Sequence, residues 1–403
     1  MSSAPSPGRV LFVHQSSDLY GSDRVLLDIA QAVAQAGGEA IVALPGAGPL
    51  PQALRAVGIE VHALTDAQVL KLSRASMTAG GALRLVAAVP AALAALDRCV
   101  GARRIDLVHS NTLAVLGGAL WARRHGVRHL WHVHEIVERP RLAARAFPWL
   151  LRWLADDVVC NSHATRRWLT ESQPALAARS KVVWNGVDPT ALLHVDAAGA
   201  AALQALREHF RPAGARLAIG LVGRINRMKG HALLLDASER LLTLGFKGFS
   251  IVFVGSPPLG QEHFLTQLQE RIAISPLRDR VVVKPYMEYV AQAFAALDIV
   301  CVPSTEAEAF GLVAVEAMAA GRPVVAARIG GLPEVVIDGS TGSLHAPGDA
   351  EALAARLRIL LDDPQLRHDF GLAGRARFQL EFTVGAMTAR MLALYSSDRR
   401  RFA

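Results

Sequence analysis

Two carboxylates, Glu308 and Glu316, are separated by seven residues in the segment PSTEAEAFGLVAVE, where an acidic loop joins a strand-like run to an Ala-rich stretch. If a helix begins near Phe310, eight helical steps cover about 12 Å, so the two carboxylates can reach opposite ends of an elongated diphosphate ligand. The start of that helix would also offer unpaired backbone N–H groups to an anion, those of Gly311, Leu312 and Val313. Taken alone, the pair is equally well explained as a helix-terminal charge and a solvated side chain.

Two basic residues, Arg224 and Lys229, lie in a second segment of this kind, GLVGRINRMKG. A strand, a turn at Gly223 and then fixed cations suit a diphosphate whose negative charge grows as a sugar leaves. A surface turn with ordinary basic residues is the alternative. The segment lacks the GxGxxG spacing of a dinucleotide site and the lysine pattern of a P-loop, which disfavours NAD binding and an ATPase or kinase.

The first half of the chain has weaker signals. Gly21 precedes a predicted helix and could admit a phosphate or sugar, although a plain tight turn explains it equally well. His132, His134 and Glu135 end a strand-like run, and alternation along a strand places the two histidines on the same face. No third ligand with suitable spacing accompanies them, and no Asp-x-Asp pair occurs in the chain. We therefore expect no metal, with the charge of a diphosphate balanced by Arg, Lys and helix ends.

Strand-length apolar runs alternate with longer Ala/Leu-rich segments along the whole chain, a pattern typical of βαβ units and parallel sheets. We expect two α/β domains, 1–184 and 185–380, with a linker in 185–215, because 403 residues exceed what one core holds. The predicted strands are Val10–Val13, Ala40–Leu44, Val61–Leu64, Leu107–His109, Leu130–His134, Val158–Asn161, Lys181–Trp184, Leu217–Val222, Phe249–Val254, Val281–Lys284, Ile299–Pro303, Val324–Ala327 and Gly342–His345.

The composition indicates a globular enzyme: 52% of the residues are hydrophobic and 19% are charged. Three scattered cysteines exclude a disulfide framework and favour a reducing cytoplasm. The first residues lack the basic and apolar regions of a secretion signal. The most apolar stretch, Leu85–Leu96, contains Pro90 and is shorter than the roughly 18 residues a span needs, so we expect a buried helix rather than an anchor.

The formal net charge is +8, and much of it lies in one stretch. Between Trp121 and Lys181 there are eleven Arg or Lys and five Asp or Glu, interleaved with Trp, Phe and Leu. Basic and aromatic residues together on helices favour weak contact with an anionic membrane surface over a nucleic-acid groove. A solvated helix face with core aromatics remains an equal alternative.

Several motifs together resemble the retaining glycosyltransferases of family 4. In the second half they are VGRINRMKGHALLLDA, ALDIVCVPSTEAEAFGLVAVEAMAAGRPVVAARIGGLPEVVIDGSTG and FTVGAMTARMLALY; in the first half, DLVHSNTL, HVHE, VVCNSHATRRWL and VVWNGVD. The resemblance spans nearly the whole chain. It implies the GT-B fold, with two Rossmann-like domains facing each other across a cleft, and a C-terminal helix, 381–403, that packs back on the first domain.

The resemblance also implies roles for individual residues. Arg224 and Lys229 would hold the donor diphosphate, Glu308 would contact the transferred sugar and Glu316 the ribose hydroxyls. His134 would approach the donor sugar from the opposite domain. The remaining donor-binding positions are Gly21, Gly223, Ala309, Phe310, Gly311, Leu312 and Val313. Many relatives carry Gly-Gly-x-Glu where this chain has Tyr20-Gly21-Ser22-Asp23, so Tyr20 could instead shape the acceptor pocket.

The resemblance thus predicts a metal-independent, retaining hexosyltransferase that needs no cofactor besides its nucleotide diphosphate sugar, with a UDP-sugar expected ahead of a GDP-sugar. The acceptor would be a saccharide or a lipid-linked molecule in bacterial polysaccharide or glycoconjugate synthesis. We expect a cytoplasmic protein, peripheral on the inner membrane face if the basic stretch binds lipid, with no nucleic-acid partner. A nucleotide-sugar epimerase of the same fold and a non-catalytic sugar-nucleotide-binding protein remain alternatives.

Overall fold

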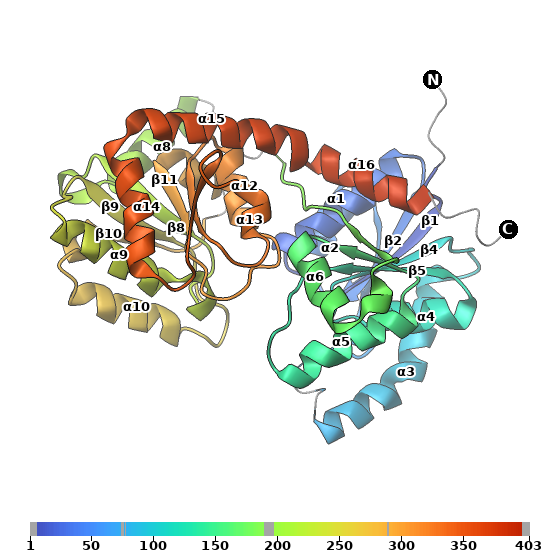
Figure 1. Ribbon diagram of the computed structural model, residues 1–403. Coiled ribbons are helices and arrows are strands. Elements are labelled where there is room, and N and C mark those ends of the chain that lie inside the picture. The colour runs from blue at the N-terminus through green and yellow to red at the C-terminus, as the bar shows by residue number, and fades with distance from the viewer. Residues whose placement is uncertain (1–5, 74–75, 77, 189–196, 288–289, 397–403) are drawn as a thin grey trace. The chain divides into compact units, whose positions relative to one another are not determined.

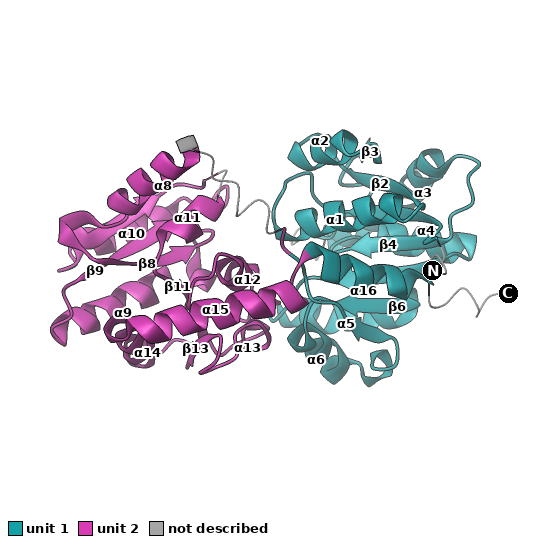
Figure 2. Cartoon of the chain, turned by 90° about the horizontal axis from the view of Figure 1, so that it is seen from above, with its two compact units in different colours: residues 1–186, 384–403 teal, residues 187–383 magenta. Residues whose placement is uncertain are grey.

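The computed structural model describes residues 6–73, 76, 78–188, 197–287 and 290–396 (Figure 1). The chain divides into two compact units (Figure 2): unit 1 comprises residues 1–186 and 384–403, and unit 2 comprises residues 187–383. These boundaries lie two or three residues beyond those we predicted. Part of the predicted linker, 189–196, and the chain ends, 1–5 and 397–403, lie outside the described residues.

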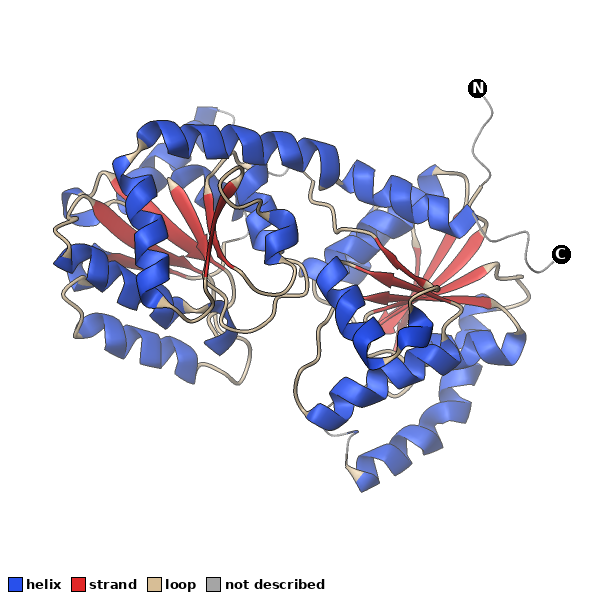
Figure 3. Cartoon of the chain, viewed as in Figure 1, coloured by secondary structure: helices blue, strands red, loops and turns tan. Residues whose placement is uncertain are grey.

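Unit 1 is built on a parallel sheet of seven strands in the order β3-β2-β1-β4-β5-β6-β7. The strands are β1 (Arg9–His14), β2 (Glu39–Pro45), β3 (Glu60–Leu64), β4 (Leu107–Asn111), β5 (Arg128–Val133), β6 (Asp157–Cys160) and β7 (Ser180–Val182). Helices cover both faces of this sheet (Figure 3): α1 (Gly21–Gln35), α2 (Pro49–Ala56), α3 (Ala79–Val100), α4 (Gly117–His125), α5 (Arg141–Leu154), α6 (His163–Ser172) and α16 (Val384–Ser396).

Unit 2 repeats this architecture with a parallel sheet of six strands in the order β10-β9-β8-β11-β12-β13. The strands are β8 (Leu217–Val222), β9 (Phe249–Val254), β10 (Val281–Lys284), β11 (Ile299–Val302), β12 (Val324–Ala327) and β13 (Gly342–His345). The helices are α8 (Ala197–His209), α9 (His231–Thr243), α10 (His263–Ala273), α11 (Val290–Ala296), α12 (Leu312–Ala319), α13 (Leu332–Val335), α14 (Ala350–Asp362) and α15 (Pro364–Glu381). The helix in the predicted linker region, α8, belongs to this unit.

The fold class agrees with the sequence prediction: both units are α/β, with parallel sheets between layers of helices. Every predicted strand is present, and its ends differ by two residues at most. The reason is physical: strands of a sheet covered on both faces are buried on both sides, so they form continuous apolar runs that stand out from the helices between them. All six residues of β9, for example, are buried.

The prediction for the apolar stretch Leu85–Leu96 is wrong in two respects. It belongs to α3, a helix of 22 residues that continues through Pro90. Among the described helices, α3 is the one that is long and apolar enough to cross a membrane by length and composition, yet only 22% of its 18-residue window is buried. Its second half packs in the core of unit 1 through Leu93 and Leu96, whereas Leu83 and Val86 are exposed.

The helix α16 completes the core of unit 1 although it follows unit 2 in the sequence. Met387, Met391 and Tyr395 are buried and pack among residues of β1, β2 and α1. The Tyr395 hydroxyl lies 2.5 Å from Nδ1 of His109, and Arg128 donates to the Leu394 and Tyr395 carbonyls. Apolar burial and hydrogen bonds together therefore hold α16 on the sheet.

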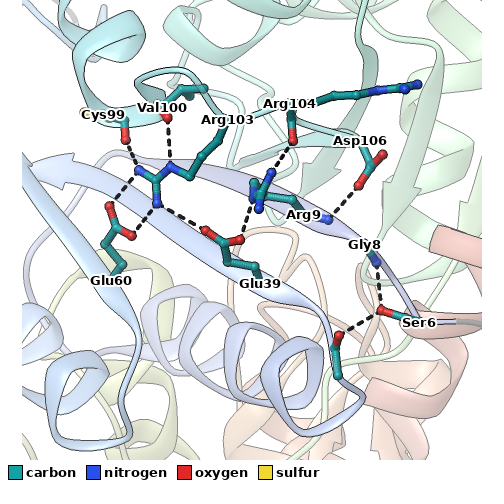
Figure 4. A network of polar contacts seen from close by, with 11 residues as sticks. Ser6, Gly8, Arg9, Glu39, Glu60, Cys99, Val100, Arg103, Arg104 and Asp106 are labelled. Atoms are coloured by element: carbon teal, nitrogen blue, oxygen red, sulfur yellow. Dashed lines mark hydrogen bonds and ion pairs between the residues drawn. The ribbon is translucent and has the colours of Figure 1, made fainter.

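A network of charged side chains lines the amino-terminal edge of the unit 1 sheet (Figure 4). Arg103 donates to Glu39 and to both carboxylate oxygens of Glu60, at 2.6 to 3.1 Å. Arg9 donates to the other oxygen of Glu39 and, through its backbone N–H, to Asp106. Because these residues stand at or just before the starts of β1 to β4, the network ties the beginnings of neighbouring strands together.

Candidate functional site

Both sheets have a topological switch point, and the predicted site residues cluster beside it. Strand order reverses between β1 and β4 in unit 1 and between β8 and β11 in unit 2. In open parallel sheets, ligands bind beyond the carboxyl ends of the strands at such a point, because adjacent connections leave in opposite directions there. The loop after β8 carries Arg224 and Lys229, and the loop after β11 carries Glu308.

The centre of the unit 2 cluster is an ion pair between Lys229 and Glu308. The Lys229 ammonium donates to Oε1 of Glu308 at 2.6 Å, and their side chains are 15% and 9% exposed. The buried Ser304 hydroxyl donates to the same oxygen at 2.6 Å. Burial by itself raises the pKa of Glu308, but Lys229, Ser304 and the charge of Arg224 together hold it below its usual value. Glu308 is therefore an anion at neutral pH.

Backbone contacts fix the two loops that carry this pair. Thr305 donates its N–H to the Met228 carbonyl and its hydroxyl to the Arg227 carbonyl. Gly230 has a positive φ of 75°, and a Cβ there would collide with the Pro303 carbonyl. Only glycine fits such a position without strain. The loops after β8 and β11 are thus held at a fixed separation, as a preorganised ion pair requires.

The helix predicted to begin near Phe310 begins at Leu312 instead. Gly311 precedes it with φ 106°, a left-handed conformation that ends the loop. The segment from Glu308 to Gly311 is consequently not helical, and our estimate of about 12 Å between the two carboxylates, which assumed eight helical steps, does not apply. Glu316 lies in the second turn of α12 and is partly exposed. The N–H groups of Leu312 and Val313 stand at the helix N-terminus, where no intrahelical acceptor exists.

The other predicted residues of unit 2 differ in their surroundings. Arg224 is exposed and close enough to lower the pKa of Glu308. Gly223, with φ 147°, directly follows β8, and Ala309 is partly exposed in the loop after β11. Phe310, in contrast, is 3% exposed and its ring contacts that of Phe382. Its side chain therefore belongs to the core, which leaves only its backbone for a ligand.

In unit 1, a chain of polar contacts runs along the carboxyl edge of the sheet. Asp23 lies 2.7 Å from Nε2 of His14, and Nδ1 of His14 lies 3.1 Å from the amide nitrogen of Asn111. The amide oxygen of Asn111 lies 2.9 Å from Nε2 of His134. The contacts orient the His134 ring. Of these four residues, the sequence analysis selected His134 alone as a site residue; the position of His14 and Asn111 at strand ends was the available signal.

His132 and His134 lie on the same face, as alternation predicted, with ring centroids 4.0 Å apart. Burial lowers the pKa of both rings well below the usual value, and their mutual proximity lowers it further for His134. Both are therefore neutral at pH 7. Among the described residues, neither ring nitrogen of His132 has a hydrogen-bond partner. A neutral His134 can donate or accept one hydrogen bond but brings no charge.

Glu135 stabilises the end of β5. Its carboxylate accepts the N–H groups of Leu113 at 3.2 Å and of His134 at 3.1 Å, which ties the loops after β4 and β5 together. Burial raises its pKa to about 7, and the two backbone donors oppose that rise. Glu135 points to backbone groups and not along with the two histidines. The described residues contain no group of three or more His, Cys, Asp or Glu side chains arranged to hold a metal ion.

The loop after β1 leads into α1 at Gly21. Tyr20 is the residue before the helix and is 51% exposed, and its N–H donates to Asp23 at 2.9 Å. Asp23 thus contacts both the helix start and His14. The Tyr-Gly-Ser-Asp sequence therefore builds a helix N-terminus whose acidic residue, Asp23, already contacts the Tyr20 N–H and His14.

Two family models match most of the chain. Residues 204–377 match the family model described as glycosyl transferases group 1, and residues 20–191 match the one described as glycosyltransferase family 4. The chain is 33% identical over 253 residues to the D-inositol 3-phosphate glycosyltransferase of Mycolicibacterium smegmatis, with 61% of this chain and 55% of the relative covered. It is 36% identical over 261 residues to the Mycobacterium tuberculosis enzyme, with 61% and 51% covered. The chain thus spans about half the length of these curated relatives.

Solved structures extend the likeness over the full chain. The Anabaena protein Alr3699/HepE in complex with UDP and glucose matches with a TM-score of 0.80 at 26% identity, covering 96% of this chain and 99% of that one. Its complex with UDP-glucose matches with a TM-score of 0.81 at 25% identity and the same coverage. WaaG, a glycosyltransferase of lipopolysaccharide biosynthesis, shares the fold at 17% identity and a TM-score of 0.68. The chain belongs to the family 4 glycosyltransferases and has the GT-B fold.

Proposed function

We propose that this protein transfers a hexose from a UDP-sugar to a saccharide or lipid-linked acceptor with retention of configuration. The observation that carries the proposal is the buried Lys229–Glu308 ion pair, fixed between two loops at the switch point of unit 2. The Anabaena protein, similar over 96% of this chain, was solved with UDP and with UDP-glucose, which favours uridine over guanosine as the base.

The proposal assigns each group of unit 2 a part of the donor. Arg224 and Lys229 balance the diphosphate, whose charge increases as the sugar leaves. Glu308 accepts hydrogen bonds from sugar hydroxyls, which its ionised state favours. Glu316 binds the ribose hydroxyls. The backbone from Ala309 to Val313 contributes N–H groups at the N-terminus of α12.

The chemistry follows the resemblance to retaining enzymes. The bond from the anomeric carbon to the diphosphate oxygen breaks, and the acceptor oxygen forms its new bond on the same face of the sugar. The acceptor proton passes to the departing phosphate oxygen, so UDP leaves and no side-chain nucleophile is required. By the same resemblance, His134 would offer a sugar hydroxyl a neutral hydrogen bond, and Gly21 would leave room for phosphate.

Two experiments test the proposal in sequence. First, thermal unfolding is measured with UDP, GDP and ADP, because a ligand present at a hundred times its dissociation constant stabilises the folded state by about 2.7 kcal/mol. UDP should raise the melting temperature most. If none of the three raises it, the nucleotide site is misplaced.

Second, UDP-glucose, UDP-galactose and UDP-N-acetylglucosamine are each incubated with oligosaccharide acceptors and with inositol 3-phosphate, the substrate in the relatives' name. UDP release that requires the acceptor, with an anomeric proton coupling that matches the donor, supports retaining transfer. Conversion of the donor without acceptor would instead identify an epimerase. If the protein binds nucleotide but converts none of the donors, it is a non-catalytic sugar-nucleotide-binding protein.

We further propose a cytoplasmic location. Cys99, Cys160 and Cys301 are all free and buried. Such thiols persist where the surroundings are reducing. Fractionation of cells, with a cytoplasmic and a periplasmic marker enzyme as references, tests this; recovery with the periplasmic marker would contradict it.

A further inference from the structure

The helix α5 of unit 1 exposes large apolar side chains along one stripe. Leu142, Trp149 and Trp153 are 76%, 53% and 54% exposed. They are spaced by seven and four residues, so they fall on the same side of the helix. The two indole rings lie side by side, with centroids 6.1 Å apart. Single exposed apolar residues are ordinary, whereas a contiguous set with two tryptophans indicates a surface that something covers.

The opposite side of α5 is already occupied by the protein core. Ala143, Phe147 and Leu151 are buried among residues of β5 and β6. Figures 1 and 2 both place α5 at the outer surface of unit 1. The exposed stripe is therefore not a misplaced core face: the helix is anchored through one side and presents the other to solvent.

Positive charge surrounds the exposed stripe. The segment from Arg139 to Ala155 contains four arginines and no acidic residue. Arg141, Arg145 and Arg152 are exposed on the helix itself, and the Arg152 guanidinium lies 5.5 Å from the centre of the Trp153 ring. Aromatic and aliphatic side chains interleaved with arginine are the pattern of a helix that lies in the interface of an anionic membrane.

We infer that the exposed face of α5, formed by Arg141, Leu142, Arg145, Trp149, Arg152 and Trp153, docks unit 1 on an anionic lipid surface. Indole rings prefer the headgroup level because they have an apolar body and a polar N–H. Arginine adds electrostatic attraction to acidic lipids. A second copy of the chain fits this face less well, because two identical arginine-rich faces would repel each other. The inference stands independently of the proposed transferase activity.

The position of α5 in the fold would bring the carboxyl edge of the unit 1 sheet close to the membrane. The helix follows β5, so its first turn, at Arg141, lies seven residues after His134 at the carboxyl edge of the sheet. Docking through α5 would place that edge of unit 1 close to the lipid headgroups. An acceptor held in the membrane would then need little of its length outside the bilayer to reach His134.

The test is vesicle flotation of the full-length protein. Vesicles of phosphatidylcholine alone are compared with vesicles containing about 30% phosphatidylglycerol, whose anionic headgroups attract basic side chains. Wild type should float with the anionic vesicles at low salt and be released at about 0.5 M salt, where charges are screened beyond a few ångströms. Replacing Arg141, Arg145 and Arg152 together with Gln should lower the partition coefficient roughly a hundredfold, about fivefold for each charge.

Trp149→Ala combined with Trp153→Ala should likewise weaken flotation with the anionic vesicles, because the apolar contact is lost. The matched controls lie on unit 2: Leu259→Ala removes a side chain that is 98% exposed, and Arg358→Gln removes an exposed charge. Both controls should float as wild type does, and circular dichroism verifies folding of every variant. Equal flotation with neutral and anionic vesicles, or flotation unchanged in the α5 variants, would overturn the inference. Self-association that is lost in the same variants would assign the face to a second copy instead.

Discussion

The polar side chains at the two edges of the unit 1 sheet differ in their exposure and in their hydrogen-bond partners. At the amino-terminal edge, Arg103 satisfies Glu39, Glu60 and the Cys99 carbonyl, so its donors are used almost completely (Figure 4). At the carboxyl edge, both ring nitrogens of the buried His132 lack a partner among the described residues. The amino-terminal edge thus has paired charges close to water, whereas the carboxyl edge has buried polar groups that mostly contact one another, with His132 unpartnered among the described residues.

This difference indicates that the amino-terminal edge contributes to stability and the carboxyl edge to function. Each partly exposed ion pair adds at most about 1 kcal/mol to the free energy of unfolding, and its charges lose little hydration on folding. A buried polar group without a partner costs about 1 to 3 kcal/mol. In open parallel sheets, ligands bind beyond the carboxyl ends of the strands. Substitutions at the carboxyl edges should therefore change activity, and those at the amino edge should change stability.

The largest effect is expected at the carboxyl edge of unit 2. Replacing Arg224 or Lys229 with Ala should lower kcat by about a hundredfold to a thousandfold, or about 2.7 to 4 kcal/mol, because each cation acts on charge that develops as the diphosphate leaves. Glu316→Gln should mainly raise the donor KM, since a ribose contact is made equally before and during transfer. Steady-state kinetics of the three variants test these expectations, and circular dichroism verifies that each variant is folded. If folded Arg224→Ala and Lys229→Ala proteins keep the wild-type kcat and kcat/KM, the donor diphosphate does not bind at this site.

A second effect concerns the unpartnered histidine. Burial holds the pKa of His132 well below its usual value, so the unfolded chain takes up a proton that the folded protein excludes. Stability from this group is complete above about pH 6.5 and is lost as the pH falls, by up to about 1.4 kcal/mol per unit. His132→Leu should therefore unfold less readily than wild type at pH 5.5. Urea titrations at pH 7.5 and 5.5 measure this, and an identical pH dependence in both proteins would show that His132 is not held neutral.

The matched change at the amino edge is Arg103→Ala. It removes two partly exposed ion pairs and two donors to carbonyls at the end of α3, which should lower the free energy of unfolding by about 1 to 2 kcal/mol. At 25 °C, kcat should stay within twofold of wild type, roughly the effect expected of a group remote from the chemistry. A loss of activity without a loss of stability would break the distinction between the two edges.

Acid should weaken the same network. Arg103 holds the pKa of Glu60 down to about 2, with a smaller contribution from His62 and against the effect of burial. The stability this carboxylate contributes is therefore present above about pH 4.5 and is lost between about pH 4.5 and 2. Glu60→Gln should flatten the decline of stability over that window. An unchanged slope from pH 5 to 2.5 in the variant would show that the pair adds nothing.

The smallest effect is expected from metal removal. The proposed cations of the site are Arg224 and Lys229, so excess EDTA should leave the transfer rate unchanged. Assays with and without EDTA, each followed by addition of Mg²⁺ or Mn²⁺, check this. A rate lost with EDTA and restored by either ion would show that a metal shares the neutralisation of the diphosphate.

The sequence predicted the sheet well and the helices less well, for identifiable reasons. Most of the strands are apolar on both faces, as in β9 and β11, and this pattern can be recognised from local sequence alone. The helix α3 continues through Pro90 although proline removes one N–H donor and crowds the carbonyl four residues before it. The carbonyl left without its donor is that of Val86, on the exposed side of α3, where water can bind it. Because α3 is apolar on nearly all sides, its sequence did not show which side is exposed.

The candidate site was predictable where charge accompanied a glycine turn and not where contacts are long-range. Lys229 and Glu308 were each selected from their own segments, but their pairing joins residues 79 positions apart. Asn111 links His14 and His134 across 97 and 23 positions and has no motif of its own to mark it. The helix start at Leu312 was placed two residues early, because a glycine in the sequence does not reveal which sign of φ it adopts.

The return of α16 to unit 1 has a consequence for synthesis on the ribosome. The core formed by β1, β2 and α1 includes Met387, Met391 and Tyr395, and all of unit 2 is translated before them. At about 5 to 20 residues per second, the roughly two hundred intervening residues take about 10 to 40 s to emerge. During that interval the nascent first unit has an apolar face that only the last helix can cover. Unit 2, which is continuous in sequence, can finish folding first, although it starts second.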